Sequence, residues 1–125
     1  MRFNRIKLSF RSQNLLGTMK KRTGLTPNLL ARFSLCLSLK DPSIPNPDEF
    51  DDKGSEISPL VLFGEYEDTY RALMIQRLNT DHLLLNQDML NKMLKAHLNR
   101  GTIALFARIH DLSDFHEMIK VERAQ

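Results

Sequence analysis

The side chains with the plainest chemistry in this chain are cations, and they are unevenly placed. Residues 1–40 contain nine basic side chains and no acidic one, and the basic residues are Arg2, Arg5, Lys7, Arg11, Lys20, Lys21, Arg22, Arg32 and Lys40. Residues 41–125 hold the other nine basic residues and all fifteen acidic ones, which gives that part a net charge of −6. Lysine and arginine bind phosphates, and each contact releases condensed counterions. The asymmetry therefore indicates a polyanionic partner, with an unusually basic solvated surface as the alternative.

The densest basic cluster is Lys20-Lys21-Arg22. In a phosphate site the lysines act as point charges, and the arginine can bind one phosphate through two hydrogen bonds. The alternative is a solvated helix end, where cations suit the helix dipole. Together with the cations upstream of this cluster, we predict a nucleic-acid site made of Arg5, Lys7, Arg11, Lys20, Lys21 and Arg22.

Motifs for catalysis or metal binding are absent from the sequence. It has no phosphate loop of the GxxxxGK[ST] or GxGxxG type, no HExxH and no CxxC. The histidines, which lack the spacing of metal ligands, are His82, His97, His110 and His116. We expect His97 to be structural and Cys36 to be a small buried hydrophobic residue on an apolar helix face. The sequence thus predicts no catalytic residue, no metal and no cofactor, with an enzyme that uses Cys36 or the histidines as the alternative.

The composition fits one soluble domain spanning residues 1–125. Of these residues 42% are hydrophobic, which is compatible with a folded protein. No apolar stretch approaches the roughly 20 residues of a membrane helix, and the first ten residues alternate basic and apolar side chains, unlike a signal peptide. The single cysteine agrees with a reducing compartment. We therefore expect a cytoplasmic protein with no membrane segment.

Periodicity predicts the elements that position the cations. Residues 3–8 alternate like a half-buried strand, which turns its two cations away from the core. Residues 11–22 carry a helical apolar stripe, and Gly24 fits a C-terminal cap. A second helix, at 26–39, opens with a Thr-Pro pair that suits an N-terminus. The order strand, helix, helix is typical of ribbon-helix-helix proteins, in which the strands of two chains pair and face DNA.

The predicted helix 26–39 is apolar nearly all round, because only Arg32, Ser34 and Ser38 interrupt its apolar residues. A helix of this kind must be covered on both sides. We therefore expect it to pack against a copy of itself in an oligomer.

The rest of the chain predicts a loop and a small helical bundle. Residues 41–59 hold four of the five prolines and an acidic patch, which is typical of an exposed loop. Residues 60–120 form the bundle, with helices at 65–78, 87–99 and 102–109 and a last turn or two at 113–120. Tyr66 and Leu73 are among the residues expected to point inward. The predicted fold is thus mainly α, a single domain with a ribbon-helix-helix-like part at 1–40, and the chain end that follows the last helical turn is expected to fray.

Three segments resemble the landmarks of the DndE family of DNA sulfur-modification proteins. They are KRTGLTPNLLARFSLCLSLKDPSIP at 21–45, LFGEYEDTYRALMIQRL at 62–78 and AHLNRG at 96–101. They occur in the family's order, the first is long enough to be specific, and the resemblance covers roughly residues 3–109. The segment after His110 matches no landmark.

The resemblance implies properties that charge and periodicity do not. It implies a part in DNA phosphorothioation beside a cysteine desulfurase, an iron–sulfur enzyme and an ATPase. It also implies a homotetramer that binds DNA, preferably nicked, through a lysine-rich face, which falls here on Lys20, Lys21 and Arg22 with Arg5, Lys7 and Arg11 nearby. Our first hypothesis is an accessory DNA-binding subunit of that system. The rivals are a ribbon-helix-helix repressor specific for one operator, and the enzyme considered above.

Overall fold

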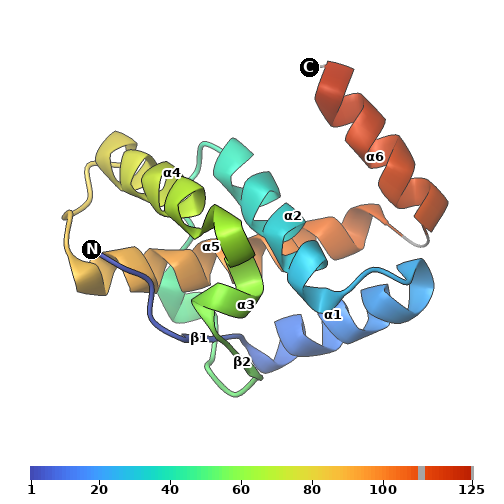
Figure 1. Ribbon diagram of the computed structural model, residues 1–125, viewed down its shortest axis with the longest axis horizontal. Coiled ribbons are helices and arrows are strands. Elements are labelled where there is room, and N and C mark those ends of the chain that lie inside the picture. Colours follow the sequence, from blue (N-terminus) through green and yellow to red (C-terminus); the bar gives the residue numbers. More distant parts are fainter. Residues whose placement is uncertain (110–111, 125) are drawn as a thin grey trace.

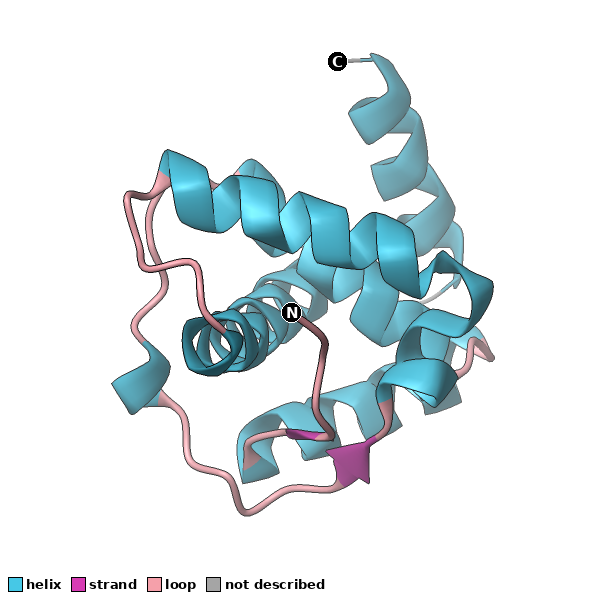
Figure 2. Cartoon of the chain, turned by 60° about the vertical axis from the view of Figure 1, so that its left-hand side comes forward, coloured by secondary structure: helices cyan, strands magenta, loops and turns pink. Residues whose placement is uncertain are grey.

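The computed structural model describes residues 1–109 and 112–124, with side chains for residues 1–109 and 113–121. Its elements in chain order are β1 (Ile6–Lys7), α1 (Phe10–Thr23), α2 (Pro27–Lys40), the 3-10 turn η1 (Pro47–Glu49), β2 (Glu56–Ile57), α3 (Pro59–Phe63), the 3-10 turn η2 (Gly64–Tyr66), α4 (Glu67–Thr80), α5 (Gln87–Arg108) and α6 (Leu112–Ala124). The helices gather around α5, and the short ribbon of β1 and β2 lies at one edge (Figures 1 and 2). The predicted mainly α fold with a short N-terminal strand and two helices is confirmed.

Local capping explains why α1 and α2 begin and end as predicted. The Ser9 side chain accepts a hydrogen bond from the backbone N–H of Ser12, which satisfies a free donor at the start of α1. Gly24 ends the same helix in the left-handed region, at φ 77°, where a glycine has no steric penalty. Thr26 caps α2 in the same way as Ser9 caps α1, and Pro27 occupies its first turn.

Helix α5 is one continuous helix through the middle of the fold, where we had predicted two separate helices. The predicted gap between 99 and 102 contains Gly101, and this glycine allows two helices to approach closely. A Cβ built on Gly101 would lie 1.8 Å from the carbonyl oxygen of Ser34, so only glycine lets α2 and α5 cross this closely. The apolar residues around the crossing, Leu30, Leu35, Leu94, Leu98 and Leu105, are fully buried.

The ribbon is built within one chain. β1 pairs antiparallel with β2, with Ile6 opposite Ile57 and Lys7 opposite Glu56. The strand thus has a partner in its own chain that we did not predict, and the segment 41–59 is not all loop. Pairing of β1 with a second chain stays a prediction. Residues after the acidic patch extend the pairing, because the backbone N–H of Gly54 donates to Leu8 over 2.8 Å. Backbone groups of a strand need hydrogen-bond partners, and the chain returns to supply them.

The chain's own helices cover most of α2. It packs on α5, α1 and α3, and Phe33 on its remaining side meets Phe115 of α6 edge-on, with ring centroids 4.7 Å apart. Phe115 is only 3% exposed, and α6 is a full helix where a turn or two was predicted. The apolar character of α2 is thus largely explained inside one chain. Among the described residues, no helix has both the length and the apolar character needed to cross a membrane.

Candidate nucleic-acid interface

Helix α1 carries four of the six predicted DNA-binding residues, and all four side chains are exposed: Arg11, Lys20, Lys21 and Arg22. The buried face of the helix consists of Ser12, Leu16, Met19 and Thr23. The ten residue steps from Arg11 to Lys21 span about 15 Å along the helix axis at about 1.5 Å per step. Helix α1 runs along one edge of the molecule in both views (Figures 1 and 2), so these cations lie on an open surface without an acidic residue on the same helix.

The ribbon contributes less positive charge than the sequence predicted. Arg5 and Lys7 are exposed, as expected for the outward face of β1. However, Glu56 of β2 lies opposite Lys7, and its carboxylate is 3.2 Å from Nε of Arg5. Both partners of this ion pair are solvated, so the pair adds little stability, but it places a negative charge beside both cations. Sequence reasoning missed Glu56 because it missed β2.

An aromatic ring fixes the end of the basic cluster. The guanidinium carbon of Arg22 lies 5.3 Å from the ring centroid of Phe106 on α5, within the range of a cation–π contact. This contact holds one cation of the cluster against the body of the protein. Arg32, in contrast, is not part of this surface, because its Nε donates to the carbonyl of Leu62 between α2 and α3.

Two side chains from distant parts of the chain fix the start of α1. The buried Asn99 of α5 accepts the backbone N–H of Ser9 over 3.0 Å, and the carboxylate of Asp51 accepts that of Phe10 over 3.0 Å. Hydrogen bonds from the backbone of Phe10 and of Lys53 lower the pKa of Asp51. The acidic segment, predicted only as an exposed loop, therefore supplies an anion to the N-terminus of α1, where the helix dipole favours one.

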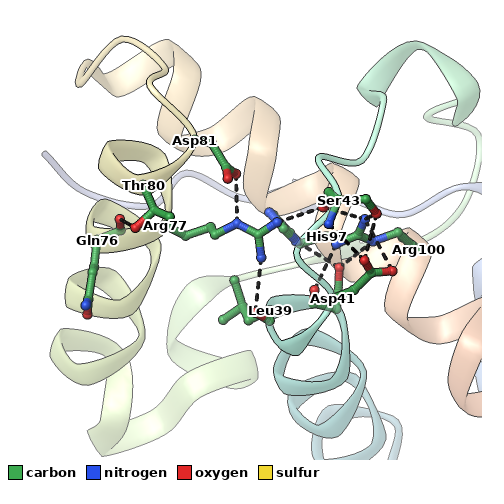
Figure 3. A network of polar contacts seen from close by, with 10 residues as sticks. Leu39, Asp41, Ser43, Gln76, Arg77, Thr80, Asp81, His97 and Arg100 are labelled. Atoms are coloured by element: carbon green, nitrogen blue, oxygen red, sulfur yellow. Dashed lines mark hydrogen bonds and ion pairs between the residues drawn. The ribbon is translucent and has the colours of Figure 1, made fainter.

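Two arginines hold the end of α2, as Figure 3 shows. Arg77 of α4 donates to the carbonyls of Leu39 and Ser43, at 3.1 and 2.7 Å. Arg100 of α5 donates to the carbonyls of Ser38 and Ser43, both at 2.8 Å. The last carbonyls of a helix lack partners within the helix, so these guanidiniums act as its C-terminal cap. In the segment AHLNRG, Asn99, Arg100 and Gly101 therefore each have a structural role within the fold.

His97 lies beside these two arginines. Its Nδ1 is 2.8 Å from the hydroxyl of Ser38, and its side chain is buried. Among the described residues, none forms a hydrogen bond with its Nε2. Burial, followed by the charges of Arg77 and Arg100, lowers the pKa of His97 to about 3. The imidazole is therefore neutral at physiological pH, which agrees with the structural role predicted for it. Within the described residues, no three His, Cys, Asp or Glu side chains could hold a metal ion. His110 and Asp111 lie outside that part.

A neutral buried histidine predicts acid sensitivity. The pKa of His97 is lower in the folded chain (about 3) than its ordinary value of 6.5, so its contribution to stability is complete above pH 6.5 and is lost as pH falls toward 3. Because one pKa unit corresponds to about 1.4 kcal/mol, we expect a loss of about 2 kcal/mol between pH 7 and pH 5 in urea unfolding. His97→Gln should remove most of this pH dependence. The exposed His82→Gln is the matched control and should retain it. An unchanged dependence in His97→Gln would contradict the prediction.

Cys36 is not the buried hydrophobic residue that the sequence predicted. It is exposed, with Sγ 3.9 Å from the hydroxyl of Tyr70. The side of α2 that carries Cys36 lines a groove of about 340 Å³ between α2 and α4, so no described side chain packs closely over it. Tyr66 and Leu73, predicted to point inward, also line this groove and are 52% and 41% exposed. The prediction was wrong for these two residues, whereas Met74 and Leu78 of α4 are buried as expected. The reason is that α2 does not cover the full width of the apolar side of α4.

These features define a class of protein. It is a small helical protein in which the long central helix α5 packs against the basic helix α1, and a short two-stranded ribbon precedes α1. Comparison with protein families assigns the chain more narrowly. Residues 5–111 match DndE, described as DNA sulphur modification protein DndE. The chain belongs to the DndE family, which confirms the resemblance found in the sequence. Helix α6 follows the matched residues.

Solved structures agree with this assignment. The chain is similar to DndE from Escherichia coli B7A, described as involved in DNA phosphorothioation modification, with 27% identity and a TM-score of 0.69 over 84% of this chain and 98% of that one. It is also similar to a DndE mutant involved in DNA phosphorothioation, with 25% identity and a TM-score of 0.68 over 84% of this chain and 99% of that one. A comparison with curated protein sequences found no match.

Proposed function

We propose that this protein is a non-catalytic, DNA-binding subunit of a cytoplasmic DNA phosphorothioation system, and that it holds duplex or nicked DNA through backbone phosphates. The observation that carries the proposal is the exposed basic surface of α1 in a member of the DndE family. Lys20, Lys21 and Arg22 bind phosphates at one end of this surface. Arg11 and Lys7 do so at the other end.

The dimensions of the surface suit a nucleic-acid backbone. Double-stranded DNA carries one negative charge per about 1.7 Å of its axis, so a basic helix of about 15 Å faces several phosphates at once. Arg5 contributes less, since Glu56 competes with phosphate for its guanidinium. The same carboxylate makes the ribbon a poor groove reader, which favours phosphate binding over the operator-specific repressor.

Self-association and partner binding are the second part of the proposal. The groove between α2 and α4 is almost entirely apolar, and we assign it to contacts with further copies of the chain in a homotetramer. Its lining residues are Leu29, Arg32, Phe33, Cys36, Tyr66, Thr69, Tyr70 and Leu73. The chemistry of sulfur incorporation belongs to the desulfurase, iron–sulfur enzyme and ATPase of the system.

Binding through phosphates predicts a steep dependence on salt. With five or six phosphates neutralised, the logarithm of the binding constant should fall with the logarithm of salt concentration at a slope of about −5. Fluorescence anisotropy with a labelled duplex of random sequence, between 50 and 200 mM salt (about the range over which such contacts weaken most visibly), measures this slope. The same duplex carrying one nick tests the preference for nicked DNA. A flat salt dependence would sink the proposed function.

A further inference from the structure

The solvent side of α1 carries more than cations. At about 100° of rotation per residue, Phe10, Asn14, Gly17 and Lys21 fall within about 60° of one another around the helix axis. This central stripe faces away from the buried residues of the helix. Asn14 and Lys21 are exposed, and the Phe10 side chain is 54% exposed. An aromatic ring and a side-chain amide thus share the outermost line of the helix with a lysine.

The remaining cations of α1 lie on both sides of the central stripe. Arg11 and Arg22 are about 90–110° from its middle in one direction, and Lys20 is about 90° from it in the other. A helix that enters a DNA groove meets one phosphate strand on each side and base edges in front. The charges of α1 have this distribution. The helix itself contains no acidic residue, and the Asp51 carboxylate lies at its first residue, where it accepts the backbone N–H of Phe10.

Gly17 in the central stripe has no explanation inside the chain. Glycine is among the least favourable residues in a helix interior. A Cβ built on Gly17 would meet nothing within 4 Å, so packing does not require a glycine here. A bare position on an exposed helix is useful where another molecule approaches the helix backbone closely.

We propose that α1 lies in the major groove of duplex DNA and reads bases there. A helix with its side chains is about 10–12 Å across, and the major groove is about 12 Å wide. Arg11, Arg22 and Lys20 bind the two phosphate strands. Asn14 hydrogen-bonds N6 and N7 of an adenine, the pairing that its amide suits best, and Phe10 contacts a thymine methyl group. This inference rests on the proposed DNA binding and extends it from phosphates to base pairs.

The first test asks whether Asn14 carries sequence information. Wild-type protein and Asn14→Ala are used to enrich duplexes from a random-sequence pool, and the bound DNA is sequenced. We expect the wild type to prefer A·T at one position by about 5- to 150-fold, and Asn14→Ala to lose that preference with an unchanged salt slope. Asn79→Ala, which removes an exposed asparagine from α4, is the matched control and keeps the preference.

The second test uses opposite effects on stability and on binding. Gly17→Leu should raise the melting temperature of the free protein by about 3 °C, because leucine is a better helix former and meets open space. It should nevertheless weaken binding to the preferred duplex by about tenfold or more, since the side chain pushes α1 out of the groove and breaks the Asn14 contact. Ala72→Leu, an exposed position of α4, is the control and leaves binding unchanged.

Three results would overturn the inference. If Asn14→Ala keeps every preference of the wild type, Asn14 does not read a base. If Gly17→Leu binds DNA as the wild type does but changes the molecular mass of the protein in light scattering, the close neighbour of α1 is a second copy of the chain. If the wild type binds DNA with a steep salt slope and no sequence preference, phosphate binding stands without base reading. Absence of DNA binding would instead remove the proposed function itself.

Discussion

Gly101→Ala should leave the protein unable to fold. The added methyl group would lie 1.8 Å from the carbonyl oxygen and 2.5 Å from the carbonyl carbon of Ser34. Both are backbone atoms in the middle of α2, so no side-chain rotation relieves the clash, and the two helices must separate along their main contact. Overpacking of a core costs about 1–3 kcal/mol when side chains can adjust. A clash between two backbones exceeds that range and removes much of a total stability of about 5–15 kcal/mol.

The measurement is thermal and urea unfolding followed by circular dichroism, and we expect no cooperative transition for Gly101→Ala. The matched control is Gly17→Ala, the same substitution in a helix where the new methyl group meets nothing within 4 Å. It should be stabilising by about 0.5–1 kcal/mol, because alanine is the better helix former. A Gly101→Ala protein that melts within a few degrees of the wild type would show that α2 and α5 do not cross as closely as described.

The helices that the sequence predicted best are those with local signals at their ends. Gly24 and the Thr26-Pro27 pair placed the turn between α1 and α2 correctly, because capping depends on residues next to the helix itself. The prediction of two helices at 87–99 and 102–109, where α5 is continuous, has a related cause. From the sequence, a glycine within a helical pattern indicates a break, whereas here it indicates the close approach of another helix that the sequence does not place.

Contacts between distant segments were the part that could not be predicted. Asp51 lies in a proline-rich segment without periodicity, yet it binds the start of α1, and Glu56 joins the ribbon next to Arg5. Two-residue strands leave almost no pattern in a sequence, since alternation needs several residues to be visible. Cys36 shows the same limit, because its exposure depends on how much of α2 the neighbouring α4 covers.

The candidate site could be predicted in its charges but not in its arrangement. The absence of acidic residues from positions 1–40 already pointed to the α1 cations, and all of them are exposed. The predicted site also included Arg5 and Lys7, which the structure places beside a carboxylate. The sequence alone could not show that the central stripe of α1 has cations on both sides, because this depends on which face of the helix is buried. We therefore propose that phosphates bind mainly on α1 rather than on the ribbon.

Neutralising the end of α1 should abolish most DNA binding without unfolding the protein. In the triple variant K20Q/K21Q/R22Q, three phosphate contacts are lost. Each contact contributes about 0.9 to the salt slope, so the slope should fall by about 2.7. Taking the electrostatic contribution to vanish near 1 M salt, the affinity at about 0.1 M should drop by between about two and three orders of magnitude. The fold should remain, since the lysines are exposed and removing cations from a helix end costs about 1 kcal/mol or less each.

The control separates position from net charge. K53Q/K92Q/K120Q removes three exposed lysines outside α1 and changes the net charge of +3 by the same amount. If DNA is held on α1, this variant should bind within about tenfold of the wild type, because screening over about 10 Å at 0.1 M salt weakens the effect of distant charges. Equal losses in the two triple variants would mean that overall charge attracts DNA to no particular surface. A loss confined to the α1 variant requires phosphates to lie against Lys20, Lys21 and Arg22, which places the bound duplex at the C-terminal end of α1.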